Sequence, residues 1–340
     1  MKLHILGNPR VPSGLKNRID PFSVFVHKYI KHLGSKYEMI HYGLPGAEVD
    51  CEHVDIDVPL LPNRDEHNKN LNRAISPEIS KRKSKDDMIV CFFGAENSEA
   101  TFAHQDLKIV EPSIGYRTNA VFAPFRAFTS YAHMHMFYGE RGMLMNPSWT
   151  DAVIPNPFTV SEFEYKQDKQ DYFLYLGRVC KEKGVDLAIQ ATEKIGARLI
   201  IAGPGDLRSM GYDNIPDHVE CVGTVDADAR KDLLANAKCL LGLTYYVEPF
   251  GNMVIEANLS GTPCITTDWG AFPETVIDGV TGYRVRDFNT LVEAMDQVVH
   301  IEPWECRRNG LRYSDEIIHA RHDEWRSEEH TSELQSLAYL

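Results

Sequence analysis

The sequence predicts two parallel α/β domains. Short apolar runs that end in glycine or polar turns recur along the chain, and amphipathic segments of helix length lie between them. This alternation is typical of parallel sheets that are covered by helices. At 340 residues the chain is also long for a single hydrophobic core, so we expect two domains of roughly 150 residues each.

The predicted strands divide into two groups. A helix near residues 22–33 is expected to cover one face of the first sheet. The strands of the first group are residues 2–6, 38–42, 88–93, 108–111 and 152–154. The strands of the second group are residues 172–176, 198–202, 219–222, 239–243, 263–266 and 282–284, with helices between most of them.

The linker between the two groups is predicted at Pro155-Asn156-Pro157. Two prolines there interrupt the pattern after a strand and before a polar stretch. The first domain is therefore expected to cover residues 1–156, and the second to cover residues 157–325.

The end of the sequence does not fit the α/β pattern. Residues 326–336 resemble the conceptual translation of a common sequencing adapter, so we treat residues 326–340 as a non-native tail outside the fold. On this interpretation the natural protein continues differently beyond Trp325, and its final helix is missing from this sequence. A genuine polar C-terminal tail is the alternative.

The composition predicts a cytoplasmic protein. The net charge of −13 disfavours non-specific binding to nucleic acid, and no apolar run is long enough to form a transmembrane segment. The N-terminus has neither the long apolar region nor the cleavage site of a signal peptide. The seven cysteines are scattered without any C-x-x-C pair, which fits a reducing compartment without zinc or disulfides.

The most informative segment is residues 245–257. It follows a predicted strand and leads into a helix that we expect to begin near Pro249, where free N–H groups and the helix dipole suit a diphosphate. Glu248 lies just outside this helix, and Glu256 lies roughly 10 Å further along it. One glutamate can therefore meet a sugar and the other a ribose. The alternative is a loop glutamate and a solvated helix glutamate.

This segment resembles the E-x7-E signature of retaining glycosyltransferases with the GT-B fold, in particular family 4 (glycosyl transferases group 1). Five other stretches match motifs of that family in order, and the resemblance covers about residues 171–286. The stretches are residues 175–184, 201–205, 222–224, 261–263 and 268–274. The resemblance implies two Rossmann-like domains that face each other across a cleft, with the acceptor mainly on the first domain and a nucleotide sugar mainly on the second. It also implies retention at the anomeric carbon.

A basic pair, Arg178 and Lys183, is the predicted catalytic apparatus together with Glu248. A planar guanidinium and a flexible ammonium can grip two phosphate oxygens and neutralise the leaving diphosphate without a metal. An ordinary charged helix start is the alternative for this pair. The resemblance implies that Glu248 contacts the donor sugar, and no cofactor is expected because the nucleotide sugar is a substrate. It further implies that the donor is bound by Glu256 at the ribose and by the backbone of Gly251, Asn252 and Met253 at the phosphates.

The first domain offers fewer candidate site residues than the second domain. Gly7 ends the first strand where the family has a glycine-rich loop facing the donor, although the usual paired glycines are absent. The histidine that many members carry after the strand at residues 108–111 is also absent, and Glu111 or Ser113 takes its place. His135 is a further acceptor-side candidate, with a packed core histidine as the alternative. The sequence does not specify whether the acceptor is a glycan, a lipid or a small molecule.

Some features of the sequence are compatible with functions other than sugar transfer. Asp226-Ala-Asp228 imitates a metal-binding D-x-D motif, but it precedes a predicted helix, so we expect an N-cap and a first-turn acid. A nucleotide-sugar epimerase of the same fold and a non-catalytic nucleotide-sugar-binding protein remain as rival functions.

Overall fold

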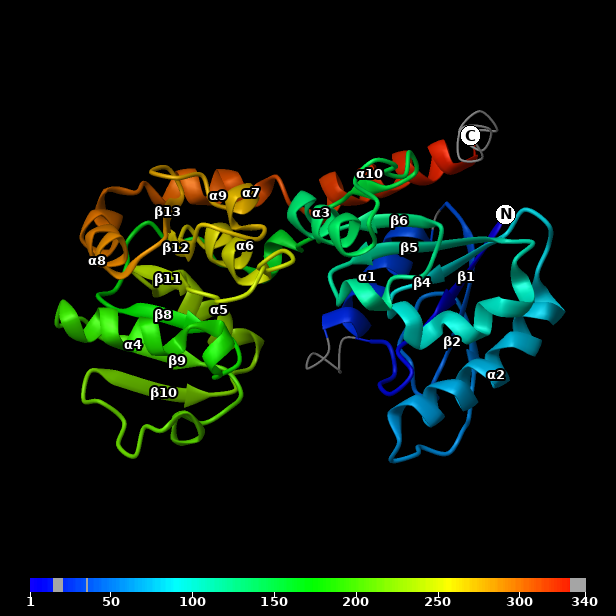
Figure 1. The fold of residues 1–340 in the computed structure, drawn as a ribbon, viewed down its shortest axis with the longest axis horizontal. Helices are drawn as coiled ribbons and strands as arrows, with labels where there is room; N and C mark the ends of the chain where they lie inside the picture. The colour runs from blue at the N-terminus through cyan, green and yellow to red at the C-terminus, as the bar shows by residue number, and fades with distance from the viewer. Residues whose placement is uncertain (15–20, 35, 331–340) are drawn as a thin grey trace. The chain divides into compact units, whose positions relative to one another are not determined.

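The computed structural model describes residues 1–14, 21–34 and 36–330, which form two compact units (Figure 1). Within the described residues, unit 1 contains Met1–Thr129, Met134–Ile154 and the end of the chain from His319 to His330. Unit 2 contains Ser130–His133 and Pro155–Ile318. The expected boundary at residues 156 and 157 lies beside this division.

Unit 1 is built on a seven-stranded parallel sheet with the strand order β3-β2-β1-β4-β5-β6-β7. The strands are β1 (Lys2–Leu6), β2 (Glu38–Gly43), β3 (Glu52–Asp55), β4 (Met88–Cys91), β5 (Lys108–Ile114), β6 (Phe125–Phe128) and β7 (Ala152–Val153). The helices are α1 (Pro21–Leu33), α2 (Arg64–Arg82), η2 (Gly94–His104), η3 (Thr118–Ala120), α3 (Tyr131–Glu140) and α10 (Asp315–His330), of which α3 and α10 each cross between the units. Helix α2 packs its apolar residues against the sheet.

Unit 2 is built on a six-stranded parallel sheet with the strand order β10-β9-β8-β11-β12-β13. The strands are β8 (Phe173–Leu176), β9 (Leu199–Ala202), β10 (Val219–Gly223), β11 (Cys239–Gly242), β12 (Cys264–Thr267) and β13 (Gly282–Val285). The helices are η4 (Val160–Glu162), η5 (Lys181–Lys183), α4 (Val185–Lys194), η6 (Leu207–Met210), α5 (Ala227–Asn236), α6 (Asn252–Leu259), α7 (Phe272–Thr275), α8 (Phe288–Gln297), η7 (Val298–His300) and α9 (Pro303–Leu311).

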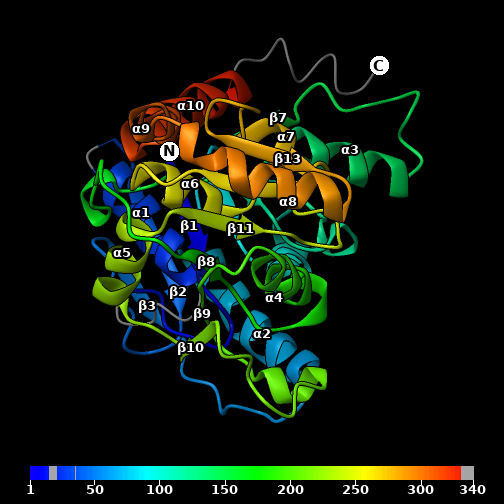
Figure 2. The same ribbon diagram turned by 90° about the vertical axis from the view of Figure 1, so that its left-hand side faces the viewer.

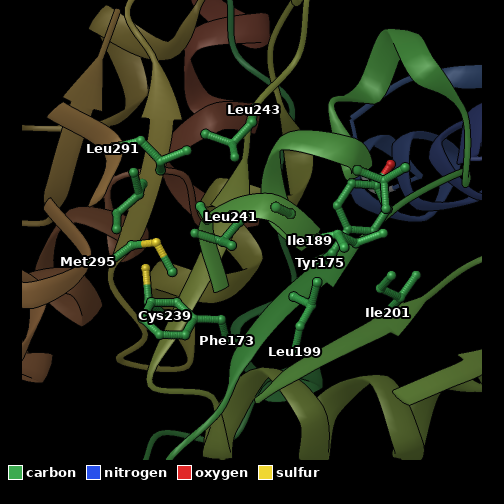
Figure 3. Close-up of a cluster of buried hydrophobic side chains, with 14 of the residues drawn as sticks. Phe173, Tyr175, Ile189, Leu199, Ile201, Cys239, Leu241, Leu243, Leu291 and Met295 are labelled. Atoms are coloured by element: carbon green, nitrogen blue, oxygen red, sulfur yellow. The ribbon is translucent and has the colours of Figure 1, made fainter. Parts of the chain in front are cut away.

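Helices cover both faces of the sheet in unit 2 (Figure 2). Because successive strand residues point to opposite faces, Phe173 packs with helices α4 and α8 while Leu174 packs with α5 and α6. The core on the α4 and α8 side includes Leu241, Leu291 and Met295 (Figure 3). This arrangement confirms the predicted parallel α/β architecture of the second domain.

The sheets share a topological feature that bears on function. In unit 2 the first strand, β8, lies between β9 and β11. The order of the strands therefore reverses at β8: β9 and β10 follow on one side of it, and β11, β12 and β13 follow on the other. Strand β1 of unit 1 likewise lies between β2 and β4. Ligands of open α/β sheets bind outside the carboxyl ends of the strands at such a switch point.

Two strands of unit 1, β3 and β6, were not predicted. Strand β3 has the polar sequence Glu-His-Val-Asp and lies at the edge of the sheet, so it has no apolar run to reveal it. Strand β6 is short, follows Pro124 and contains Arg126. All eleven predicted runs overlap strands of the structure.

The structure contains a last helix, although from the sequence we expect the final helix to be missing. Helix α10 is present, and from His319 it belongs to unit 1. The Trp325 indole N–H donates to the Thr150 carbonyl at 3.2 Å, and the fully buried Arg326 guanidinium donates to the Tyr29 hydroxyl. Arg326, which we had assigned to the tail, is therefore part of the packed structure. Residues 331–340 of the expected tail lie outside the described residues.

No helix within the described residues is both long enough and apolar enough to span a bilayer.

Candidate functional site

Four of the predicted residues of unit 2 follow the two strands that flank the switch point of its sheet. Arg178 and Lys183 follow strand β8, while Glu248 and Gly251 follow the neighbouring strand β11. Parallel strands bring their carboxyl ends to the same edge, so residues far apart in the sequence become neighbours.

The loop after β8 is fixed by backbone hydrogen bonds. The Gly177 N–H donates to the Ala202 carbonyl at 2.9 Å, and the Tyr245 N–H donates to the Glu182 carbonyl at 2.9 Å. The Tyr175 hydroxyl donates to the Arg178 carbonyl at 2.6 Å. The Arg178 side chain itself is exposed, so its guanidinium is accessible to a ligand.

Lys183 and Glu248 form an ion pair across the switch point. The Lys183 Nζ lies 2.8 Å from the Glu248 Oε2, and both side chains are largely shielded from solvent. The Tyr246 hydroxyl donates to the same oxygen at 2.8 Å, and its ring lies 5.0 Å from the ammonium. The structure thus brings two of the predicted catalytic residues, Lys183 and Glu248, into direct contact. Tyr246 carries no motif of its own, so sequence reasoning missed it.

The backbone of Glu248 is held by the loop after strand β12. The Ala271 N–H donates to the Glu248 carbonyl at 2.9 Å. Gly270 has φ +65°, and a Cβ there would lie 2.5 Å from the Glu248 nitrogen. Glycine therefore permits both the left-handed conformation and the close approach at this position.

We expect Gly270→Ala to destabilise the protein by about 2 kcal/mol or more, because it adds a steric clash to the left-handed strain. Gly279→Ala is the matched control, since Gly279 has φ +71° and open space around a built Cβ. Urea unfolding of both variants measures the difference. Equal losses of stability in the two variants would show that the steric clash with Glu248 adds nothing to the cost of the left-handed backbone conformation.

Helix α6 begins at Asn252 rather than near Pro249. Gly251 adopts φ +81° at the N-cap position, which turns the chain into the helix only after this residue. The first N–H groups of the helix, at Asn252 and Met253, have no acceptor within the helix. These are the N–H groups that we expect from the sequence to meet the phosphates of a donor.

Glu256 is buried within helix α6, and its carboxylate forms an ion pair with Arg230 of helix α5. Sequence reasoning missed Arg230. A buried carboxylate requires a partner, and this requirement is the signal that could have prompted a search for a cation. A ribose at Glu256 would share the carboxylate with this guanidinium.

The candidates of unit 1 occupy separate positions. Gly7 follows strand β1, and its N–H donates to the Tyr42 carbonyl at 2.8 Å. Ser113 is buried in strand β5, while His135 is exposed on helix α3. The neighbouring His133 is the buried histidine of this helix.

Glu111 is buried in strand β5 of unit 1. Its Oε2 accepts hydrogen bonds from the N–H groups of Phe122 at 3.1 Å and Ala123 at 2.9 Å, and its Oε1 accepts one from the Tyr116 hydroxyl. Burial raises the pKa of the Glu111 carboxyl. These contacts favour a structural role for Glu111 over contact with an acceptor.

The D-x-D lookalike has the structure expected of a helix start. The Asp226 side chain caps helix α5 by accepting from the Ala229 N–H at 2.9 Å, and Asp228 lies exposed in the first turn. The predicted N-cap is confirmed.

Comparisons with known proteins show what the chain is similar to. Residues 159–313 match the family model described as Glycosyl transferases group 1. A relative from Methanocaldococcus jannaschii, described as an uncharacterized glycosyltransferase, is 33% identical over 132 residues, which are 36% of this chain and 34% of the relative. The alignment thus spans about a third of the relative's length.

Solved structures resemble nearly the whole chain. Sucrose-phosphate synthase from Thermosynechococcus elongatus has a TM-score of 0.75 and 17% identity, covering 96% of this chain and 98% of its own. HepE from Anabaena, solved in complex with UDP-glucose, has a TM-score of 0.71 and 14% identity, covering 96% of this chain and 100% of its own. At such identities the likeness shows the shared fold.

Proposed function

We propose that this protein transfers a sugar from a nucleotide-sugar donor to an acceptor, because residues 159–313 match the glycosyl transferases group 1 model and the fold is that of GT-B structures. The observation that carries the proposal is the ion pair between Lys183 and Glu248 at the switch point, beside the exposed Arg178. This arrangement combines a sugar-binding carboxylate with two cations for a diphosphate. That HepE was solved with UDP-glucose supports a nucleotide-sugar donor.

The chemistry requires stabilisation of a leaving group. The bond between the anomeric carbon and the β-phosphate oxygen breaks, and its electron pair leaves with the nucleoside diphosphate. Arg178 and Lys183 neutralise the charge that develops on the phosphate. The acceptor oxygen forms the new bond, and its proton passes to the departing phosphate oxygen. Attack on the face from which the leaving group departs gives retention, without a covalent intermediate.

The binding part of the proposal is tested by a thermal-shift screen against UDP, GDP and ADP sugars. A ligand at 100 times its dissociation constant stabilises the folded protein by about 2.7 kcal/mol. We expect one nucleotide class to raise the melting temperature. Absence of a shift with every class at millimolar concentration would contradict the proposal. Product analysis then separates transfer from epimerisation, since an epimerase changes the sugar nucleotide without an acceptor.

Transfer is expected to be independent of metal, because Arg178 and Lys183 can supply the positive charge at the diphosphate. EDTA should therefore leave the initial rate of transfer unchanged. The measurement compares the rate with EDTA, with added magnesium and with added manganese. A collapse of the rate in EDTA that either metal restores would count against this mechanism.

A cytoplasmic location is also proposed. The seven cysteines are all free thiols, and four of them are buried. Free thiols persist in a reducing compartment.

A further inference from the structure

Tyr246 connects the two charged side chains at the switch point. Its hydroxyl donates to the Glu248 Oε2 at 2.8 Å, and the Lys183 ammonium donates to that same oxygen at 2.8 Å. The ammonium also lies 5.0 Å from the centre of the Tyr246 ring. One carboxylate oxygen therefore has two donors, and one tyrosine contacts both members of the ion pair.

The main chain of Tyr246 is fixed from two sides. The Trp269 indole N–H donates to the Tyr246 carbonyl at 3.2 Å, and the Thr244 hydroxyl donates to it at 3.3 Å. Burial and the neighbouring Glu248 both raise the pKa of the Tyr246 hydroxyl. The phenol thus keeps its proton and remains a hydrogen-bond donor to the carboxylate.

In the proposed reaction Lys183 changes partners when the donor binds. In the structure its ammonium is engaged by Glu248, whereas in the proposed reaction it neutralises a diphosphate. Glu248 is only 8% exposed, so water cannot fully replace the lost cation. Removing the partner of a buried charge is strongly unfavourable unless another donor remains.

We infer that Tyr246 is a positioning residue that allows Lys183 to move from Glu248 to the diphosphate of the donor. Its hydroxyl keeps Glu248 hydrogen-bonded and in place after the ammonium has left. Its ring keeps the ammonium beside the site in both states through a cation–π contact. This inference rests on the proposed function, since it assumes a diphosphate ligand.

The first test is Tyr246→Phe, which keeps the ring and removes the hydroxyl. We expect the dissociation constant of a nucleoside diphosphate (UDP, GDP or ADP, whichever binds the wild type) to rise about tenfold in calorimetry. The donor KM should rise more than kcat falls. The matched control is Tyr245→Phe, since Tyr245 is the exposed neighbour whose hydroxyl meets Asp186 at 3.2 Å. Its dissociation constant should stay within twofold of the wild-type value.

A double-mutant cycle separates positioning from a general effect on folding. In a Glu248→Gln background the ion pair is gone, so Tyr246→Phe should no longer weaken binding of the nucleoside diphosphate. A tenfold effect that persists in this background would overturn the inference, because the hydroxyl would then act without Glu248.

The outcomes also distinguish the inference from the proposed function. If the wild type binds one nucleoside diphosphate and Tyr246→Phe binds it equally well, the inference is wrong and the proposed function stands. If the wild type binds none of the three, both are wrong.

Discussion

Replacing Arg178 with alanine is expected to lower the turnover number about a hundredfold, which corresponds to roughly 3 kcal/mol of lost transition-state stabilisation. The exposed guanidinium follows strand β8 at the switch point, where charge grows on the phosphate as the leaving group departs. Arg178→Lys should recover only part of the rate, because an ammonium lacks the bidentate geometry. Steady-state kinetics with one active donor measures both variants.

Glu256→Gln provides the contrast to Arg178→Ala. The ribose that we assign to Glu256 changes little in bonding during transfer, so this substitution should raise the donor KM more than it lowers kcat. The Arg230 guanidinium, which pairs with Glu256, would retain a neutral amide partner in the variant. Near-normal turnover in Arg178→Ala, or lost turnover with unchanged donor affinity in Glu256→Gln, would show that the roles are assigned wrongly.

Acidification from pH 7 to pH 4.5 is expected to destabilise the protein by about 5 kcal/mol through two buried histidines of unit 1. Burial lowers the pKa of His41 to about 3, with His53 contributing, and lowers that of His319 to about 3, with His32 and Arg326 contributing. An unfolded histidine titrates near pH 6.5. The unfolded state therefore binds protons first as the pH falls, and the stability is lost progressively between pH 6.5 and pH 3.

The size of this effect follows from the two pKa values. At pH 4.5 the pH lies about two units below the pKa of an unfolded histidine, which costs on the order of 2 to 3 kcal/mol per residue. The pKa of His322 is lowered by burial as well, so this residue acts in the same direction. A loss of this size is a large part of the 5–15 kcal/mol that typically stabilises a folded protein.

Urea unfolding at the two pH values tests this prediction. His319→Gln should lose roughly 2 to 3 kcal/mol less than the wild type on acidification, whatever its stability at pH 7. His135→Gln is the control variant, because it replaces a histidine that is exposed on helix α3. The carboxylates are common to all three proteins and cancel in the comparison. An identical pH dependence for His319→Gln and the wild type would contradict the assignment.

The placement of the candidate residues in unit 2 was predictable from the sequence because these residues follow strands. Apolar runs located strands β8 and β11, and parallel strands bring their carboxyl ends together, so Lys183 and Glu248 could be expected to meet. Tyr246 and Arg230 could not be found in this way. Their importance depends on which atoms they contact, and hydrophobic periodicity carries no information about such contacts.

The prediction for unit 1 was less complete for a different reason. Strand β3 is polar because it lies at an edge, and an edge strand needs no apolar run. The last helix, Asp315–His330, was missed because residues 326–340 were assigned to a non-native tail and the final helix was expected to be missing. His319, His322 and Arg326 recur there at helical spacing, and all three are buried.

The chain order of unit 1 has a consequence for synthesis on the ribosome. Its last helical segment begins at His319, after the whole of Pro155–Ile318 has been made. At about 5–20 residues per second, unit 1 therefore waits on the order of ten to thirty seconds before α10 can cover α1. During this interval Phe25 and Tyr29, whose rings pack against His322, lack that cover. The nascent first domain thus exposes these two aromatic rings until residues 319–326 have left the ribosome, and such transiently exposed apolar surface is what chaperones protect.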